Sequence, residues 1–180
     1  MSTFISILRG INVGGHKKIL MEDLKKVYEA MGFTEITTYV QSGNVIFKTA
    51  QNNSDPLLSD KIENAIKEKY SFHVPVIIRT VDEMRLTISS NPFLQEDGID
   101  SEKLHVTFLD QEPSPTDISA ITRYDFSPDR FRILGKEVYL YCPESYGNTK
   151  LSNDFFEKKL HVKATTRNWK TVLRLGELSG

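Results

Sequence analysis

The chain of 180 residues lacks several features that mark common protein classes. Cys142 is its only cysteine, which excludes a disulfide within the chain and is typical of a reducing cytoplasm. Purely apolar stretches such as Val76-Ile77-Ile78 are far too short to span a bilayer. No basic leader precedes an apolar run at the N-terminus, so we expect no signal peptide. These absences predict a cytoplasmic protein that does not enter a membrane.

An excess of positive charge is also lacking. Lys and Arg total 23 against 24 acidic residues, whereas a general electrostatic nucleic-acid binder usually has a basic excess. The four histidines lack the spacing of metal ligands, so no metal site is predicted. The content of 39% hydrophobic and 26% charged residues is ordinary for a globular protein.

The first half of the chain is predicted to run strand, helix, strand, strand, helix, strand. Runs of β-forming residues predict the strands, and apolar residues at helical spacing predict the helices. Ser42-Gly43 predicts a tight hairpin, because glycine adopts positive φ easily. We expect strands at Phe4–Leu8, Ile36–Gln41, Asn44–Lys48 and Val74–Arg79, and helices around Leu24–Met31 and Leu58–Ile66.

The same order of elements recurs from about residue 103 to 166. A capping box at Thr80–Glu83 predicts a helix that connects the two halves. A last helix is expected from about Trp169, with Gly176 as its stop. The strands of this half are expected at Leu104–Leu109, Phe131–Leu134, Glu137–Tyr141 and Val162–Thr165, and its helices at Ser114–Thr122 and from Ser152 through Leu160.

The order βαββαβ is the ferredoxin-like arrangement. The sequence therefore predicts an α+β protein with two tandem ferredoxin-like βαββαβ subdomains, antiparallel sheets and a C-terminal helix. We expect residues 1–90 to form the first subdomain with the connecting helix, and residues 91–180 the second with the C-terminal helix. One half alone, about 80 residues, would have only a modest core, so packing of the halves together is favoured.

Basic residues and glycines follow the first predicted strand. Gly10 and Gly15 have the spacing of a phosphate-binding P-loop, but His16 stands where that motif requires Lys. Bare backbone N–H groups and nearby cations could still bind an anion, although the glycines alternatively only turn the chain. The candidate ligand-binding residues of this segment are Arg9, Asn12, Gly14, Gly15 and Lys17.

The predicted hairpin shares a sheet edge with this segment. The first two strands of βαββαβ are parallel, so their C-terminal ends meet at one edge, about 10 Å apart. Gln41, Ser42 and Asn44 are therefore candidate ligand-binding residues, while Gly-Asn is also ordinary turn chemistry.

A second polar cluster is predicted at an edge of the other half. Arg167 is expected at the start of the last helix, where the helix dipole favours an anion. A structural alternative pairs Arg167 with Asp154 or Glu157, and Asn168 is alternatively a helix cap. The candidate ligand-binding residues here are Lys150, Arg167, Asn168 and Lys170. No base is identifiable beside Cys142, so no catalytic residue is predicted and enzymatic activity stays open.

Three segments carry a resemblance to a known family. They are Arg9–Gly15 (RGINVGG), Thr38–Phe47, which contains QSGN, and Ala164–Val172, which contains TRNW. Together they closely resemble a widespread bacterial family, catalogued as domain of unknown function 1697, from Phe4 to about Leu175. The resemblance implies a pair of ferredoxin-like subdomains and implies no particular activity.

Three functions remain open at this stage. The first is binding of a small anionic, phosphate-bearing ligand between or at the edges of the subdomains; the sequence leaves open whether a cofactor is involved. If the two clusters converge across the subdomain interface, they would also fit a hydrolase or transferase that acts on a phosphorylated compound. The second is a single-stranded nucleic-acid binding module, with aromatics on the strands at Tyr39, Phe47, Tyr139 and Tyr141. The third is a non-catalytic protein-interaction module that uses sheet edges, as a monomer or homodimer.

Overall fold

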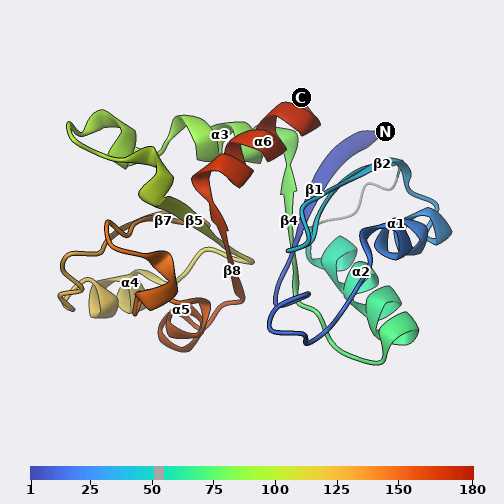
Figure 1. The fold of residues 1–180 in the computed structure, drawn as a ribbon, viewed down its shortest axis with the longest axis horizontal. Coiled ribbons are helices and arrows are strands. Elements are labelled where there is room, and N and C mark those ends of the chain that lie inside the picture. Colours follow the sequence, from blue (N-terminus) through green and yellow to red (C-terminus); the bar gives the residue numbers. More distant parts are fainter. Residues whose placement is uncertain (51–54) are drawn as a thin grey trace. The chain divides into compact units, whose positions relative to one another are not determined.

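Both halves of the chain form the predicted order of strands and helices in a computed structural model that describes residues 1–50 and 55–180. One compact unit comprises Met1–Arg85 with Leu175–Gly180, and the other comprises Leu86–Arg174. Each unit holds one four-stranded sheet in which all pairs are antiparallel, with helices packed on it (Figure 1). The α+β class and the two ferredoxin-like subdomains are confirmed. The predicted boundary between residues 90 and 91 stays a prediction.

The first subdomain has the strand order β2-β3-β1-β4. Its central strand β1 pairs with β3 on one side and β4 on the other, so Ile5 lies opposite both Ile46 and Arg79. β2 is an edge strand, and its register with β3 shifts between Thr34 and Thr37. The elements are β1 (Ser2–Leu8), α1 (Met21–Ala30), β2 (Thr34–Tyr39), β3 (Asn44–Thr49), α2 (Asp55–Tyr70) and β4 (Val76–Thr80).

The core of the first subdomain lies between its sheet and two helices. α1 buries Leu24, Val27 and Tyr28, which have the predicted helical spacing. α2 lies beside α1 on the same face of the sheet (Figure 1). The ring of Phe47 on β3 lies 5.3 Å from that of Tyr28 and 4.6 Å from that of Phe33, centroid to centroid. Each side chain fully buried in this way stabilises the fold by about 1.5–3 kcal/mol.

The second subdomain has the corresponding strand order β6-β7-β5-β8. Ser114 and Ser152 cap its two helices, as serine side chains accept a hydrogen bond from a backbone N–H of the first turn. The core includes Ile121, Val138 and Phe156. The elements are β5 (Leu104–Leu109), α4 (Pro115–Ile121), β6 (Arg130–Leu134), β7 (Glu137–Tyr141), α5 (Asn153–Leu160) and β8 (Ala164–Asn168).

The last strand begins and ends later than predicted. β8 spans Ala164–Asn168, because Thr166 and Arg167 pair with Thr107 and Val106 of β5. The hydroxyl oxygens of Thr107 and Thr166 are 2.7 Å apart, so these polar side chains satisfy one another within the sheet. The predicted last strand is therefore present, but its predicted bounds at Val162–Thr165 and the predicted helical position of Arg167 are wrong.

Two further helices complete the chain. α3 (Val81–Ser89) begins with the predicted capping box: Glu83 Oε2 accepts from Thr80 N at 2.8 Å, and Thr80 Oγ1 accepts from Glu83 N at 3.1 Å. α6 (Trp169–Ser179) continues through Gly176, so the predicted stop is wrong. Glycine inside a helix costs only about 1 kcal/mol, which is too little to end it. No helix in the described part of the chain is both long and apolar enough to cross a membrane.

Candidate functional site

The loop between β1 and α1 is fastened to the β2–β3 hairpin by the side chain of Asn12. Its Nδ2 donates to Ile19 O at 2.9 Å and to Gln41 O at 2.8 Å, and its Oδ1 accepts from Ile19 N at 2.9 Å. The predicted meeting of loop and hairpin is confirmed, and it is closer than the expected spacing because the loop folds across the hairpin. These three bonds use the amide of Asn12 to hold the loop.

Gly14 and Gly15 form the tip of a small hairpin within this loop. Both have positive φ, 58° and 77°, and His16 N donates to Val13 O at 3.0 Å. Positive φ at both central residues is the geometry of a type I′ hairpin turn, in which glycine is favoured. The glycines therefore turn the chain, as the alternative interpretation expected, and they leave an exposed tip rather than a P-loop cradle.

The polar residues of the β2–β3 hairpin mostly serve the turn. Asn44 is buried, and its Nδ2 donates to Tyr39 O at 2.9 Å and to Ser42 Oγ at 3.4 Å. Gly43 has φ 87°, and a Cβ atom there would lie 2.6 Å from Ile11 Cδ1, so only glycine lets Ile11 pack over the turn. Of the three predicted hairpin residues, Gln41 is exposed.

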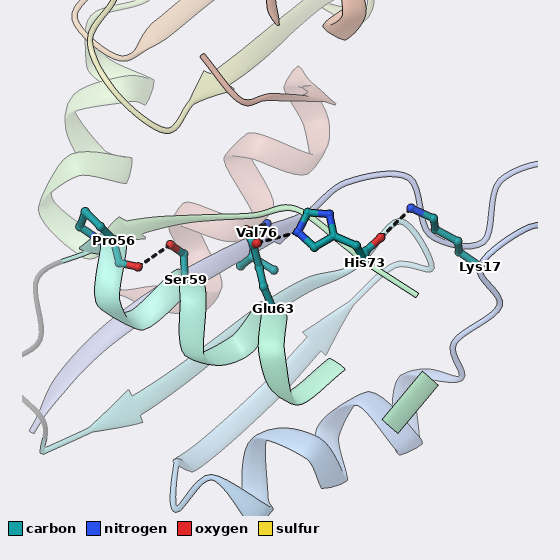
Figure 2. A network of polar contacts seen from close by, with 6 residues as sticks. All are labelled: Lys17, Pro56, Ser59, Glu63, His73 and Val76. Atoms are coloured by element: carbon teal, nitrogen blue, oxygen red, sulfur yellow. Dashed lines mark hydrogen bonds and ion pairs between the residues drawn. The ribbon is translucent and has the colours of Figure 1, made fainter. Parts of the chain in front are cut away.

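The β1–α1 loop is also tied to the link that precedes β4. Arg9 N donates to Pro75 O at 3.0 Å, and Lys17 Nζ donates to His73 O at 2.6 Å (Figure 2). The β1–α1 loop, which carries the cationic side chains of Arg9 and Lys17, therefore contacts the link that contains His73. We call the loop of residues 9–20, the turn of residues 40–43 and the link of residues 71–75 the first edge.

A buried carboxylate lies under this link. Glu63 on α2 is 6% exposed; its Oε1 accepts from Val76 N at 2.9 Å, and its Oε2 lies 2.8 Å from His73 Nε2 (Figure 2). The His73 side chain is 54% exposed. A buried carboxylate is tolerated only when donors satisfy its oxygens, and here a backbone N–H and an imidazole do so. The first edge thus carries a histidine that a buried acid holds in place.

Sequence reasoning missed both Glu63 and His73. Glu63 lies three residues before Ile66, so it borders the apolar face of α2, where an acid is unusual. That position was the available signal. Ten residues separate Glu63 from His73, and no motif links them.

The second predicted cluster does not form a comparable site. Arg167 lies within β8, is 8% exposed, and donates from Nη1 to Thr165 Oγ1 at 3.1 Å and to Thr166 O at 2.9 Å. Burial lowers the pKa of the Arg167 guanidinium to about 10. The argument from a helix start therefore fails for Arg167, and these two hydrogen bonds are to residues of its own strand.

The other residues of the second predicted cluster have surroundings that do not favour an anion site. Asn168 Oδ1 accepts from Thr171 N at 2.8 Å, so Asn168 caps α6, as the alternative interpretation proposed. Lys170 is exposed in the first turn of that helix. Lys150 lines a cavity of about 190 Å³ that also includes the acidic residues Asp125, Asp129 and Glu144. Such acidic surroundings disfavour an anion beside Lys150.

The aromatic residues expected to bind nucleic acid do not form a platform. Phe47 and Tyr139 are buried at 0% and 1% exposure, and the Tyr139 hydroxyl donates to Thr87 O at 2.8 Å. Tyr39 and Tyr141 are half-buried. Stacking on single strands needs accessible ring faces, which the two buried residues do not offer.

Cys142 is fully buried in the core of the second subdomain. Burial raises the pKa of its thiol to about 11, which disfavours the reactive thiolate.

A larger cavity, about 700 Å³, lies beside the edge strand β2. Its lining includes two cations and two acids, Lys25, Lys48, Glu29 and Glu35, and Lys48 Nζ lies 2.7 Å from Glu35 Oε2. This balance of charge gives no preference for an anion. This cavity is larger, but its size alone does not make it the better candidate for anion binding. The first edge remains the candidate anion site.

The chain was compared with curated proteins, solved structures and family models. No curated protein matches it. A solved structure, "The structure of conserved bacterial protein SP0830 from Streptococcus pneumoniae", has a TM-score of 0.77 and 21% sequence identity, with 99% of each chain covered. That likeness shows the shared fold. Residues 1–139 match a family described as "Protein of unknown function (DUF1697)"; the match includes the RGINVGG and QSGN segments and ends before the TRNW segment. The chain belongs to this family.

Proposed function

We propose that the protein binds a small phosphate-bearing anion at the first edge. The observation that carries the proposal is the 2.6 Å hydrogen bond from Lys17 Nζ to His73 O, which holds a cation at the backbone of a residue whose imidazole is half-exposed. A lysine ammonium has three donors, so this bond leaves others for an anion. When it is protonated, the imidazole adds an Nδ1–H donor and a second positive charge.

Other features of the first edge support the same ligand chemistry. Arg9 directly follows β1, and its N–H binds the same link as Lys17 does. Lys18 is exposed next to Lys17. Glu63, an acid in contact with the link, is buried beneath it and is bonded to His73 and Val76. Phosphate oxygens interact most strongly with cationic donors of this kind.

Thermal unfolding with added ligands tests the proposal. Inorganic phosphate, a nucleoside monophosphate and a sugar phosphate are the probes, each titrated against the whole chain. A ligand present at one hundred times its Kd adds about 2.7 kcal/mol of stability, which raises Tm by roughly 5–10 °C for a chain of this size. We expect at least one probe to do so.

A pair of lysine variants locates the effect. Lys17→Ala should abolish the rise in Tm, because it removes the cation at His73. Lys26→Ala should retain it, because Lys26 is exposed on α1 and only 3.5 Å from Asp23 Oδ1 in a weak surface pair. No shift with any probe, or an equal shift in Lys17→Ala, would overturn the proposal.

The interaction-module alternative has weaker support. Its best site would be the edge strand β2, where a partner strand could pair. That edge has a register shift between Thr34 and Thr37, a positive φ of 49° at Glu35, and the Lys48–Glu35 ion pair. Bulges and charges of this kind are typical of edges protected against pairing with another strand.

A further inference from the structure

We propose that His73 is a phosphoryl-accepting nucleophile, with Glu63 as its positioning residue; this inference rests on the proposed anion binding at the first edge. The starting point is the placement of Glu63 at the border of a buried helix face. Its Oε1–Val76 contact fastens β4 to α2 and needs no histidine. The Oε2–His73 contact of 2.8 Å goes beyond that structural need.

The carboxylate determines which nitrogen of His73 can react. An ionised carboxylate only accepts hydrogen bonds, so the Nε2 atom that faces Glu63 carries the ring proton. The neutral ring then has its lone pair on Nδ1. Figure 2 shows the imidazole meeting Glu63 through one nitrogen, with the other directed away from the carboxylate. A carboxylate bonded to the far nitrogen makes an imidazole more basic and fixes its orientation.

Lys17 supplies the charge that a phosphoryl group needs. Its Nζ is held 2.6 Å from the carbonyl oxygen of His73. The cation is therefore fixed to the same residue that carries the proposed nucleophile. Phosphoryl transfer depends mainly on positioning and on neutralising the three phosphoryl oxygens. At the first edge, Glu63 would position the half-exposed imidazole of His73, and Lys17 would neutralise charge on the phosphoryl oxygens.

The proposed step balances as follows. The Nδ1 lone pair of His73 forms a bond to phosphorus of a small donor with a good leaving group, such as an acyl phosphate or phosphoramidate. The bond between phosphorus and the leaving group breaks, and the leaving group departs with that electron pair; from phosphoramidate it departs as ammonia. The ring becomes a phosphorylated imidazolium, whose positive charge Glu63 stabilises through Nε2–H.

His161 is an internal control for the chemistry. It occupies the corresponding link of the second subdomain, and its side chain is 74% exposed, more than that of His73. Its Nδ1 lies 3.2 Å from Asp117 Oδ2, a carboxylate that is 27% exposed. If exposure alone governs the reaction, His161 reacts first. If the buried carboxylate and Lys17 govern it, His73 reacts first.

The experiment incubates the whole chain with phosphoramidate and maps the added phosphoryl groups by mass spectrometry. We expect phosphorylation of His73 to exceed that of His161 by at least tenfold, and to be lost in His73→Gln. Glu63→Gln keeps an oxygen for Val76 N but loses the ionised acceptor, so labelling of His73 should fall roughly 10–100-fold. Lys17→Ala should also reduce it, whereas His161→Gln should leave it unchanged.

Two further measurements keep the outcomes separate. Binding of inorganic phosphate to the unmodified chain is measured alongside the labelling. Phosphate binding without selective labelling of His73 overturns this inference and leaves the proposed function standing. Absence of phosphate binding overturns the proposed function, and the inference with it. Thermal unfolding of Glu63→Gln checks that the variant is folded; preferential labelling of His73 that persists in a folded Glu63→Gln overturns the positioning role.

Discussion

The two subdomains share one framework, and in each a histidine precedes the last strand but contacts a different carboxylate. In each, a glutamate on the second helix accepts the backbone N–H of the first residue of the last strand: Glu63 Oε1 from Val76 N at 2.9 Å, and Glu157 Oε1 from Ala164 N at 3.0 Å. What differs is the other partner of the first carboxylate. Glu63 also bonds His73, whereas His161, in the corresponding link, lies against Asp117. The shared contacts hold the fold, and the difference marks the candidate site.

The same comparison explains the buried arginines. Arg79 and Arg167 each stand three residues after the start of the last strand, and each donates from Nη1 to the carbonyl of the preceding residue at 2.9 Å. They are 1% and 8% exposed. A feature present in both subdomains is better explained as scaffold than as one ligand site. The structural interpretation of Arg167 is therefore favoured, and its pairing with Asp154 or Glu157 stays a prediction.

The largest effects are expected at these arginines. Arg79→Ala and Arg167→Ala each remove a long buried side chain and leave bonded acceptors behind, so each should lower the free energy of unfolding by about 2–4 kcal/mol. Urea unfolding measures this loss. An Arg167→Ala variant as stable as the parent chain, and defective only in phosphate binding, would break the proposed equivalence of the subdomains.

The paired glutamates should have intermediate effects. Glu63→Ala leaves a buried N–H without its acceptor, which costs about 1–3 kcal/mol. Glu157→Ala should cost less, because Glu157 is only half-buried. Unfolding of both variants by urea compares them directly. If Glu157→Ala loses more unfolding free energy than Glu63→Ala, burial of the glutamate does not determine the size of the loss.

The caps that follow the last strands should have smaller, matched effects. Thr80 Oγ1 accepts from Glu83 N, and Asn168 Oδ1 accepts from Thr171 N, in each case three residues on. Thr80→Ala and Asn168→Ala should each cost about 1 kcal/mol of stability. Phosphate binding should be unchanged in both. Lost binding in Asn168→Ala alone would restore Asn168 as a ligand residue.

The smallest effect is a pH dependence in the second subdomain. Hydrogen bonds from His161 and then Ser114 hold the pKa of the Asp117 carboxyl below its ordinary value of 3.8. A lowered carboxyl pKa contributes stability that is fully present above 3.8 and fades as the pH falls through the lower folded value. The stability of His161→Gln should therefore approach that of the parent chain below this range. A stability difference between His161→Gln and the parent chain that does not change in acid would contradict the pairing of His161 with Asp117.

Local signals predicted most of the fold. β5 and β7 begin and end where alternation predicted, and Ser152 caps α5 because capping depends on nearby residues. β8 was misplaced because Thr166, Arg167 and Asn168 look polar, and only pairing with β5 makes them a strand. At these residues, pairing with β5 outweighs their intrinsic preferences.

The candidate site was predicted only in part. Sequence order placed the β1–α1 loop and the hairpin at one edge, since that follows from topology. It could not indicate that Asn12 and Asn44 turn their amides to backbone atoms, or that Glu63 reaches His73. Those contacts depend on three-dimensional distances between segments without a shared motif.

The most direct measurement follows the ring signals of the four histidines by NMR while inorganic phosphate is added. We predict that the His73 signals shift in a saturable manner and that the His161 signals do not, since Lys17 bonds the carbonyl oxygen of His73 and lies in the other subdomain from His161. Lys17→Ala should remove the shift. Saturable shifts at His161 without any at His73, or at neither residue, would contradict phosphate binding at the first edge.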